Sequence, residues 1–131
     1  MPIKPAFEMV KEATAEIVTV SPADAIARMN DPDFLLVDIR DPRELEREGK
    51  IPGAFHAPRG MLEFWVDPAS PYYKPVFGEA KTFVFFCAAA GRSALSVRTL
   101  QEMGMENIAQ LGEGFSGWKK AGGPVEGGKK D

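Results

Sequence analysis

Two short runs of consecutive apolar residues constrain the fold of this chain more than any other feature. They cover residues 34–39, where Asp38 is the one charged residue, and residues 82–86, which read Thr-Phe-Val-Phe-Phe. A strand with one face in water alternates apolar and polar residues, whereas an uninterrupted apolar run is typical of a strand covered on both faces. The two runs therefore predict buried strands of a parallel sheet.

Helix signals separate and follow these runs. Ser21 and Pro22 give an N-cap followed by a proline at the first helical position, and Asp41 with Pro42 opens a short charged helix that Gly49 ends. Further helices are expected over residues 5–15 and 92–103, and a last short helix is expected to end at about residue 121. Further strands are expected over residues 17–20, near 55 and over 107–111. Strands that alternate with helices predict an α/β domain with a mainly parallel sheet.

Length and charge narrow the class of protein. The 131 residues suit one domain, with a core over about 17–125 and a flexible tail over 126–131 that is rich in Gly and Lys. A net charge of −3 argues against a nucleic-acid partner held by overall charge. The sequence has no apolar run near the roughly 20 residues of a membrane span, and no signal peptide is expected. We therefore expect a cytoplasmic protein without a membrane partner.

The counts of cysteine and histidine exclude several kinds of site. Cys87 is the single cysteine and His56 the single histidine of the chain. An internal disulfide, a pair of redox cysteines and a cysteine-based zinc cluster are therefore impossible, and so is a metal site built from several histidines. We expect neither a metal nor a cofactor, and the surroundings of one thiol decide the interpretation.

The segment that follows the strand at 82–86 is where chemistry is expected. Cys87 is followed by a loop of three alanines and a glycine, and Arg92 then opens a helix. Ligands bind beyond the carboxyl ends of strands in such sheets, and the N–H groups of a loop before a helix can hold an anion. No acidic residue lies between Lys81 and Glu102, so we expect a locally positive segment that favours a thiolate. The alternative is that Cys87 is a small buried core residue.

The roles expected in this segment are as follows. Cys87 is the candidate nucleophile and Arg92 a second catalytic residue. The groups that bind substrate are expected to come from the loop and the first helical turn, namely Ala88, Ala89, Ala90, Gly91, Arg92 and Ser93.

Three ordered motifs resemble signatures of the rhodanese-like family. Residues 87–92 resemble its active-site loop, in which four residues separate a cysteine from an arginine. Residues 37–54, which include Asp-Ile-Arg-Asp-Pro-Arg-Glu and Ile-Pro-Gly-Ala, resemble its first signature, and residues 114–125 resemble its C-terminal one. The resemblance implies a five-stranded, mainly parallel sheet with helices on both faces.

The resemblance also implies a sulfurtransferase. Cys87 would take a sulfane sulfur from a small anionic donor such as thiosulfate or a persulfide, carry it as a persulfide, and pass it to cyanide, a thiol or a protein acceptor. Two positions depart from the family pattern: Lys50 stands where a His is usual, and Ala90 where many members have Gly. A left-handed backbone at Ala90 would be strained. The loop also lacks a basic residue before Arg92, which favours a persulfide over thiosulfate as the donor.

Two other functions remain open. One is a phosphatase or an arsenate reductase, but related phosphatases place five residues between the cysteine and the arginine, whereas this chain has four. No acidic residue lies near the loop in sequence to protonate a leaving group. A non-catalytic binding module is the other alternative, and the presence of both Cys87 and Arg92 argues against it.

Several residues outside the loop are expected to support the site. Asp38 is expected to be a buried acid that accepts backbone N–H groups or pairs with an arginine, and Arg40 is expected to pair with Glu44. His56 is expected to be a loop histidine near the entrance rather than a base for Cys87. The connector over 58–75 holds aromatic side chains that could roof the site, make a subunit contact or pack internally, and these are Phe64, Trp65, Tyr72 and Tyr73.

Overall fold

The computed structural model describes residues 2–128, and within them five strands form one sheet. The strands are β1 (Thr19–Val20), β2 (Phe34–Asp38), β3 (Phe55–His56), β4 (Thr82–Phe86) and β5 (Ile108–Leu111). Their spatial order is β1-β5-β4-β2-β3, and every neighbouring pair runs parallel. The two apolar runs lie side by side as β2 and β4, with β4 in the middle. This arrangement confirms the predicted parallel sheet.

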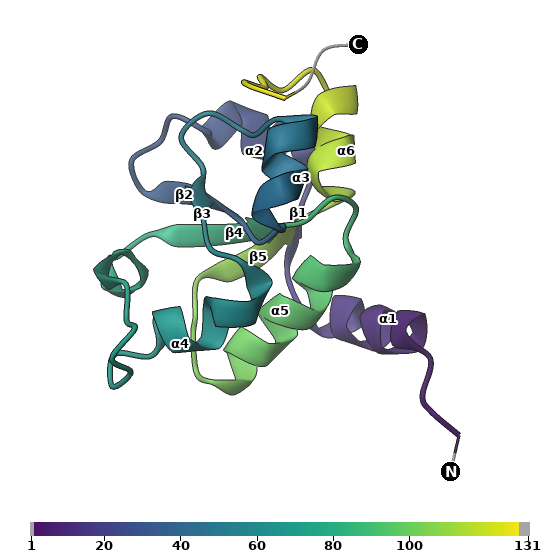
Figure 1. The fold of residues 1–131 in the computed structure, drawn as a ribbon, viewed down its shortest axis with the longest axis vertical. Coiled ribbons are helices and arrows are strands. Elements are labelled where there is room, and N and C mark those ends of the chain that lie inside the picture. Colours follow the sequence, from purple (N-terminus) through teal and green to yellow (C-terminus); the bar gives the residue numbers. More distant parts are fainter. Residues whose placement is uncertain (1, 129–131) are drawn as a thin grey trace.

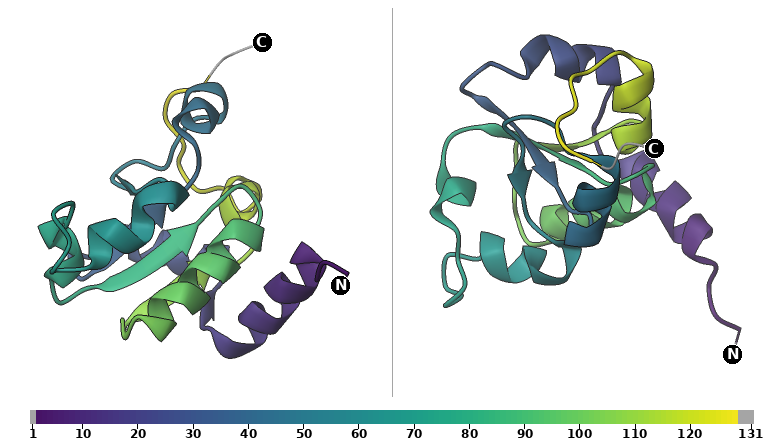
Figure 2. Two further views of the ribbon diagram at one scale, coloured as in Figure 1. Left: turned by 60° about the horizontal axis from the view of Figure 1, so that its bottom comes forward. Right: turned by 45° about the horizontal axis from the view of Figure 1, so that its top comes forward.

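Helices cover both faces of the sheet, as predicted. They are α1 (Ala6–Glu16), α2 (Pro22–Arg28), α3 (Pro42–Glu48), α4 (Leu62–Val66), α5 (Gly91–Glu102) and α6 (Gly114–Lys120). In Figure 1, α2, α3 and α6 lie above the sheet, whereas α4 and α5 lie below it and α1 packs against α5. Figure 2 shows the same layers from two further sides. No helix within residues 2–128 combines the length and apolarity needed to cross a lipid bilayer.

The side chains of β4 alternate between two hydrophobic clusters. Phe83, Phe85 and Cys87 belong to the cluster that contains residues of α4 and α5, whereas Val84 and Phe86 belong to the cluster that contains residues of α2 and α6. This is the period of two expected of a strand. Cys87 continues the alternation one residue beyond the strand, so its thiol lies on the α5 side of the sheet.

The first turn of α3 is fixed by its own side chains. The Asp41 carboxylate accepts a hydrogen bond from Arg43 N at 2.8 Å, and the Glu44 carboxylate accepts one from Asp41 N at 3.0 Å. This capping box satisfies N–H groups that the start of a helix leaves without partners. Because α3 buries none of its residues, the cap rather than core packing holds the carboxylate of Glu44 in place.

Two stretches differ from the expected irregular structure. The connector over 58–75 contains α4, because Leu62 and Val66 lie one turn apart and are both buried in the core. In the predicted tail over 126–131, Glu126 exchanges two backbone hydrogen bonds of 2.9 Å with Lys50, so the chain is held in place at that residue. Residues 129–131 lie outside the described part of the chain.

Candidate active site

The topology places a crevice between the ends of β2 and β4. The chain passes from β4 through α5 to β5, and from β2 through α3 to β3. Because β4 and β2 are neighbours while β5 and β3 lie on their outer sides, the chain leaves these two strands in opposite directions. Such a divergence leaves a crevice beyond the carboxyl ends of the strands, where ligands bind. Cys87 follows β4 directly, so it lies at this crevice.

The Cys87 thiol is buried at the start of a chain of polar side chains. The residue is 1% exposed, and its Sγ lies 3.7 Å from the hydroxyl of Ser93. Ser93 Oγ lies 2.9 Å from Gln110 Oε1, to which it donates, and Gln110 Nε2 donates to Thr19 Oγ1 at 3.3 Å. Gln110 was not among the expected site residues. Its signal is a single amide in the otherwise apolar strand β5.

Two backbone carbonyl groups at the start of the loop accept hydrogen bonds from α6. The carbonyls of Cys87 and Ala88 accept hydrogen bonds from Phe115 N at 2.8 Å and Ser116 N at 3.0 Å. A side chain at Gly114 would collide with the carbonyl oxygens of Cys87 and Ala89, so only glycine lets α6 begin this close to the loop. The start of α6 therefore fixes the shape of the loop.

The amide groups of the same loop are available to a ligand. The N–H groups of residues 88–93 donate to no acceptor within the described residues 2–128. The last of them belong to the first turn of α5, which has no partners for them within the helix. Ala90 has φ −155°, outside the left-handed region, so the alanine found there in place of glycine causes no such strain.

Arg92 and Glu44 form a bidentate pair across the crevice. Arg92 Nη1 lies 2.9 Å from Glu44 Oε2, and Nη2 lies 3.0 Å from Oε1. The hydrogen bonds from Arg92 lower the pKa of Glu44, and the same contact raises the pKa of Arg92. Arg98 likewise contacts Glu16 at 2.7 Å and Glu102 at 3.4 Å. The expected locally positive segment is therefore wrong, because Glu44 and Glu16, which are distant in the sequence, pair with Arg92 and Arg98 and offset their charges.

Asp38 and Arg40 form a buried pair beneath the crevice. Arg40 Nη2 donates to Asp38 Oδ2 at 2.8 Å and to the carbonyl of Gly49 at 2.8 Å, and both side chains are almost fully buried. The guanidinium also lies 4.1 Å from the centre of the Phe115 ring, at the start of α6. Arg40 thus connects β2, the end of α3 and the helix that holds the loop. The expected pair of Arg40 with Glu44 is wrong, because each side chain has another partner.

His56 and the aromatic residues of the connector lie away from the thiol. His56 Nε2 donates to the backbone carbonyl of Arg40 at 2.7 Å, so this nitrogen is not free to act as a base for Cys87. Trp65 packs edge-on against Phe55, with 6.1 Å between ring centres, and Phe64 is half exposed on α4. None of the four connector aromatics lines the cavity at Cys87. Of the three roles considered for the connector aromatics, Trp65 therefore has that of internal packing.

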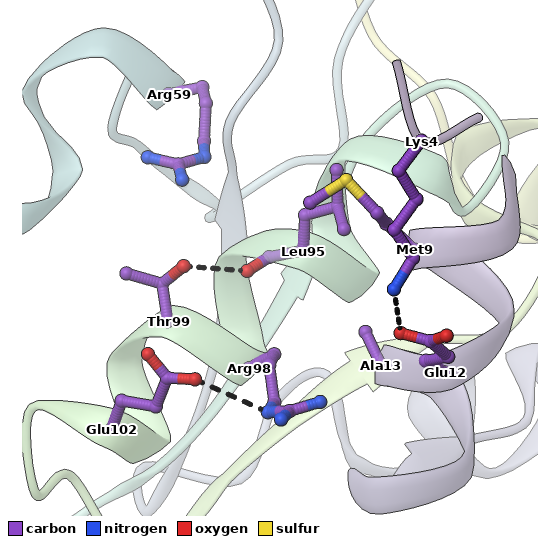
Figure 3. A pocket seen from close by; sticks show the side chains of 9 residues that line it. All are labelled: Lys4, Met9, Glu12, Ala13, Arg59, Leu95, Arg98, Thr99 and Glu102. Carbon is purple, nitrogen blue, oxygen red and sulfur yellow. Dashed lines mark hydrogen bonds and ion pairs between the residues drawn. The ribbon is translucent and has the colours of Figure 1, made fainter. Parts of the chain in front are cut away.

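Two hollows flank α1 and α5. One, of about 330 Å³, is lined by the active-site loop together with Ala6, Phe7 and Val10 of α1 and Leu95 of α5. The other, of about 390 Å³, is lined by charged side chains such as Lys4 and Arg98, which face acidic partners (Figure 3). It does not reach Cys87. Within residues 2–128, no three His, Cys, Asp or Glu side chains come together as metal ligands.

Comparison with known proteins agrees with this geometry. The rhodanese-like domain family matches residues 21–121. An uncharacterized Synechocystis protein is 31% identical over 113 residues, which cover 86% of this chain and 58% of that protein. This chain therefore spans less than two thirds of that relative's length.

Two solved structures resemble the protein over nearly its whole length. A Rhodopseudomonas palustris protein of unknown function, described as a possible tyrosine phosphatase, has a TM-score of 0.90 at 52% identity and covers 96% of this chain and 99% of its own. A homodimeric polysulfide-sulfur transferase from Wolinella succinogenes has a TM-score of 0.69 at 34% identity, covering 92% of this chain and 85% of its own. With the family match over most of its length, this chain belongs to the rhodanese-like domain family.

Proposed function

We propose that the protein is a sulfurtransferase that carries a sulfane sulfur as a persulfide on Cys87. The observation that carries this proposal is the set of unpartnered amide N–H groups over residues 88–93, next to the one thiol of the chain. The terminal sulfur of a persulfide is an anion, and oriented N–H groups in a water-poor pocket stabilise such a charge. The similarity to a polysulfide-sulfur transferase supports the same chemistry.

Sulfur transfer at this site needs no general acid. The Cys87 thiolate attacks the sulfane sulfur of the donor, and a new S–S bond forms while the bond between that sulfur and the rest of the donor breaks. The donor leaves with the electron pair, as sulfite from thiosulfate or as a thiolate from a persulfide. A thiol, a protein thiol or cyanide then takes the terminal sulfur and releases the Cys87 thiolate. In this structure the Cys87 thiol donates to Ser93 Oγ at 3.7 Å, and the Ser93 hydroxyl donates to Gln110 Oε1. Once Cys87 is an anion, the hydroxyl turns from Gln110 and donates to the sulfur.

Turnover tests this proposal. The protein is reduced, mixed with a sulfur donor and cyanide, and assayed for thiocyanate, with Cys87→Ser as the matched variant. We expect continuous thiocyanate formation by the wild type and none above background by the serine variant, whose hydroxyl is not ionised at neutral pH. Equal rates for the two proteins would remove Cys87 from the reaction.

A phosphatase is the second candidate, and two observations favour it. The similar Rhodopseudomonas protein is described as a possible tyrosine phosphatase, and the fold brings the Glu44 carboxylate to Arg92, although no acid lies near in sequence. However, Arg92 lowers the pKa of Glu44, so this carboxylate is ionised at neutral pH and cannot protonate a leaving group. Hydrolysis of an aryl phosphate by the wild type without thiocyanate formation from sulfur donors would favour the phosphatase.

A further inference from the structure

We infer that the cavity between α1 and the active-site loop selects an organic sulfur donor with an apolar substituent, a persulfide of the type R–S–S⁻. The inference rests on the proposed sulfur transfer and names the substrate class of the same site. It concerns a wall of the site that lies outside the part of the chain matched by the family, because α1 (Ala6–Glu16) precedes residue 21.

The shape of the cavity fits a small organic group next to the sulfur atom. Its volume of about 330 Å³ lies within the range of small-molecule sites. Cys87 and the loop line one side, and Phe7 and Val10 of α1 with Leu95 of α5 line the other. α1 lies directly against the loop, since a Cβ atom at Gly91 would lie 3.8 Å from Val10 Cγ2. A substrate that reaches the buried thiol through this cavity therefore contacts α1.

The charges around the cavity favour an apolar group over a second negative charge. Among the described residues, Arg92 is the one charged residue of the lining, and its two hydrogen bonds to the Glu44 carboxylate offset its positive charge. The sulfane sulfur carries one charge, for which the free loop amides are available. The sulfonate end of thiosulfate would lose its hydration against the wall of Phe7, Val10 and Leu95, which offers no cation in exchange. Burial of an apolar substituent in the same place would instead make the binding free energy more favourable.

Phe7 is the residue of this wall whose exposed surface a bound ligand would reduce most. Phe7 is 83% exposed, although it lines the rim of a cavity that ends at Cys87. Figure 1 shows α1 packed along α5 beside the loop, with its N-terminal turns projecting outward. An apolar substituent bound at Cys87 would cover part of this ring and would itself be shielded from water.

The reaction explains why one cavity serves donor and acceptor. In the exchange R–S–S⁻ + Cys–S⁻ → R–S⁻ + Cys–S–S⁻, the S–S bond of the donor breaks and a new one forms to Cys87, and the thiolate R–S⁻ leaves with the electron pair. No oxidant, reductant or proton is needed. The reverse reaction passes the sulfur to the same class of thiol. The substituent R therefore occupies the same place beside the sulfur in both directions.

Thiosulfonate anions, R–SO₂–S⁻, are stable probes of this selectivity, because each carries one charge, transfers its terminal sulfur to the Cys87 thiolate and leaves as the sulfinate R–SO₂⁻. Benzenethiosulfonate and methanethiosulfonate differ in R alone. We expect the wild type to favour the benzene compound in kcat/KM by about tenfold, the usual range for an apolar group in a pocket. Phe7→Ala should reduce this ratio about threefold or more, chiefly through a lower kcat/KM for the benzene compound. Phe64→Ala, an exposed phenylalanine on α4 outside the cavity, is the matched control.

Each outcome has a separate meaning. If neither compound adds sulfur to Cys87 of the wild type, both the proposed function and the selectivity are overturned. If both compounds load Cys87 and the ratio is the same in Phe7→Ala, Phe64→Ala and the wild type, sulfur transfer stands and the inference about α1 is wrong. If Phe7→Ala changes the ratio but also dissociates a dimer in sedimentation, a second copy of the chain covers this face, and the assignment to a small-molecule substituent is overturned.

Discussion

The carboxylate of Glu44 holds the guanidinium of Arg92 with two hydrogen bonds, at 2.9 Å from Nη1 to Oε2 and at 3.0 Å from Nη2 to Oε1. The residues lie in the first turns of α3 and α5, and they meet where the chain leaves β2 and β4 in opposite directions. The capping box of α3 fixes the carboxylate of Glu44. A planar guanidinium whose two terminal nitrogens both bind that carboxylate is held in one orientation. Glu44 thus determines where the three remaining N–H donors of Arg92 point.

Replacement of Arg92 by lysine tests this fixed orientation. Arg92→Lys keeps the charge but loses the planar fork, because an ammonium group cannot hold both carboxylate oxygens in one plane. We expect thiocyanate formation to fall by about tenfold, the equivalent of one hydrogen bond to a charged group. The measurement is kcat/KM with a single donor. Equal activity of the lysine variant and the wild type would show that charge alone matters at this position.

The Glu44–Arg92 pair also predicts how stability depends on pH. Arg92 lowers the pKa of Glu44 below the ordinary value of 4.5, so the pair stabilises the fold above that pH and loses its contribution as the pH falls through the lowered pKa. At neutral pH, Glu44→Gln should be less stable by about 1 kcal/mol or less, because Arg92 is partly exposed. Urea unfolding over a pH series should show the difference shrinking in acid. A difference that stays constant, or grows, on acidification would contradict the pair's contribution.

The hydroxyl of Ser93 is expected to matter for the thiolate rather than for the fold. Ser93→Ala removes a hydroxyl 3.7 Å from Cys87 Sγ, and we expect sulfur loading to slow by about tenfold, as for one lost hydrogen bond to an anion. Ser96→Ala is the matched control, because Ser96 is also buried on α5 but donates to the Arg92 carbonyl at 2.7 Å. Stopped-flow loading rates and urea midpoints separate the two effects. Identical rates for both variants would leave Ser93 without a role at the sulfur.

Gly114 is expected to control the shape of the loop. A Cβ there would collide with the carbonyls of Cys87 and Ala89, whereas Gly53, which also has a positive φ, has nothing within 4 Å. Gly53→Ala should therefore show only left-handed backbone strain, about 1–2 kcal/mol. Gly114→Ala should lose more stability than this and should also lose sulfur transfer. Matching stability and activity in the two variants would mean that the loop does not depend on the close approach of α6.

The sequence predicted the sheet and the place of the thiol for clear physical reasons. Uninterrupted apolar runs identify strands buried on both faces, and those runs became β2 and β4. The alternation of Phe83, Phe85 and Cys87 then follows from strand geometry. The loop of small residues before a helix predicted backbone amides without partners, and the amides of residues 88–93 have this property within residues 2–128. These features are local, so no knowledge of strand order was needed.

Most features that sequence reasoning missed depend on contacts between distant segments. Glu44 reaches Arg92 only because β2 and β4 are neighbours whose connections diverge. Arg40 was expected to pair with Glu44, but its side chain pairs with the buried Asp38, two residues away, and donates to the Gly49 carbonyl at the end of α3. α1 was predicted as a helix, and its place beside the loop depends on packing against α5, which its amphipathic pattern does not specify.

The mass of the intact protein after reaction with a sulfur donor tests the central claim most directly. Reduced wild-type protein and Cys87→Ser are each incubated with benzenethiosulfonate, freed of excess donor and measured by mass spectrometry, and the modified residue is located by peptide mapping. The account predicts a gain of one sulfur atom, located on Cys87 and removed by a thiol, in the wild type alone. An unchanged wild-type mass, or the same gain in the serine variant, would contradict a Cys87 persulfide.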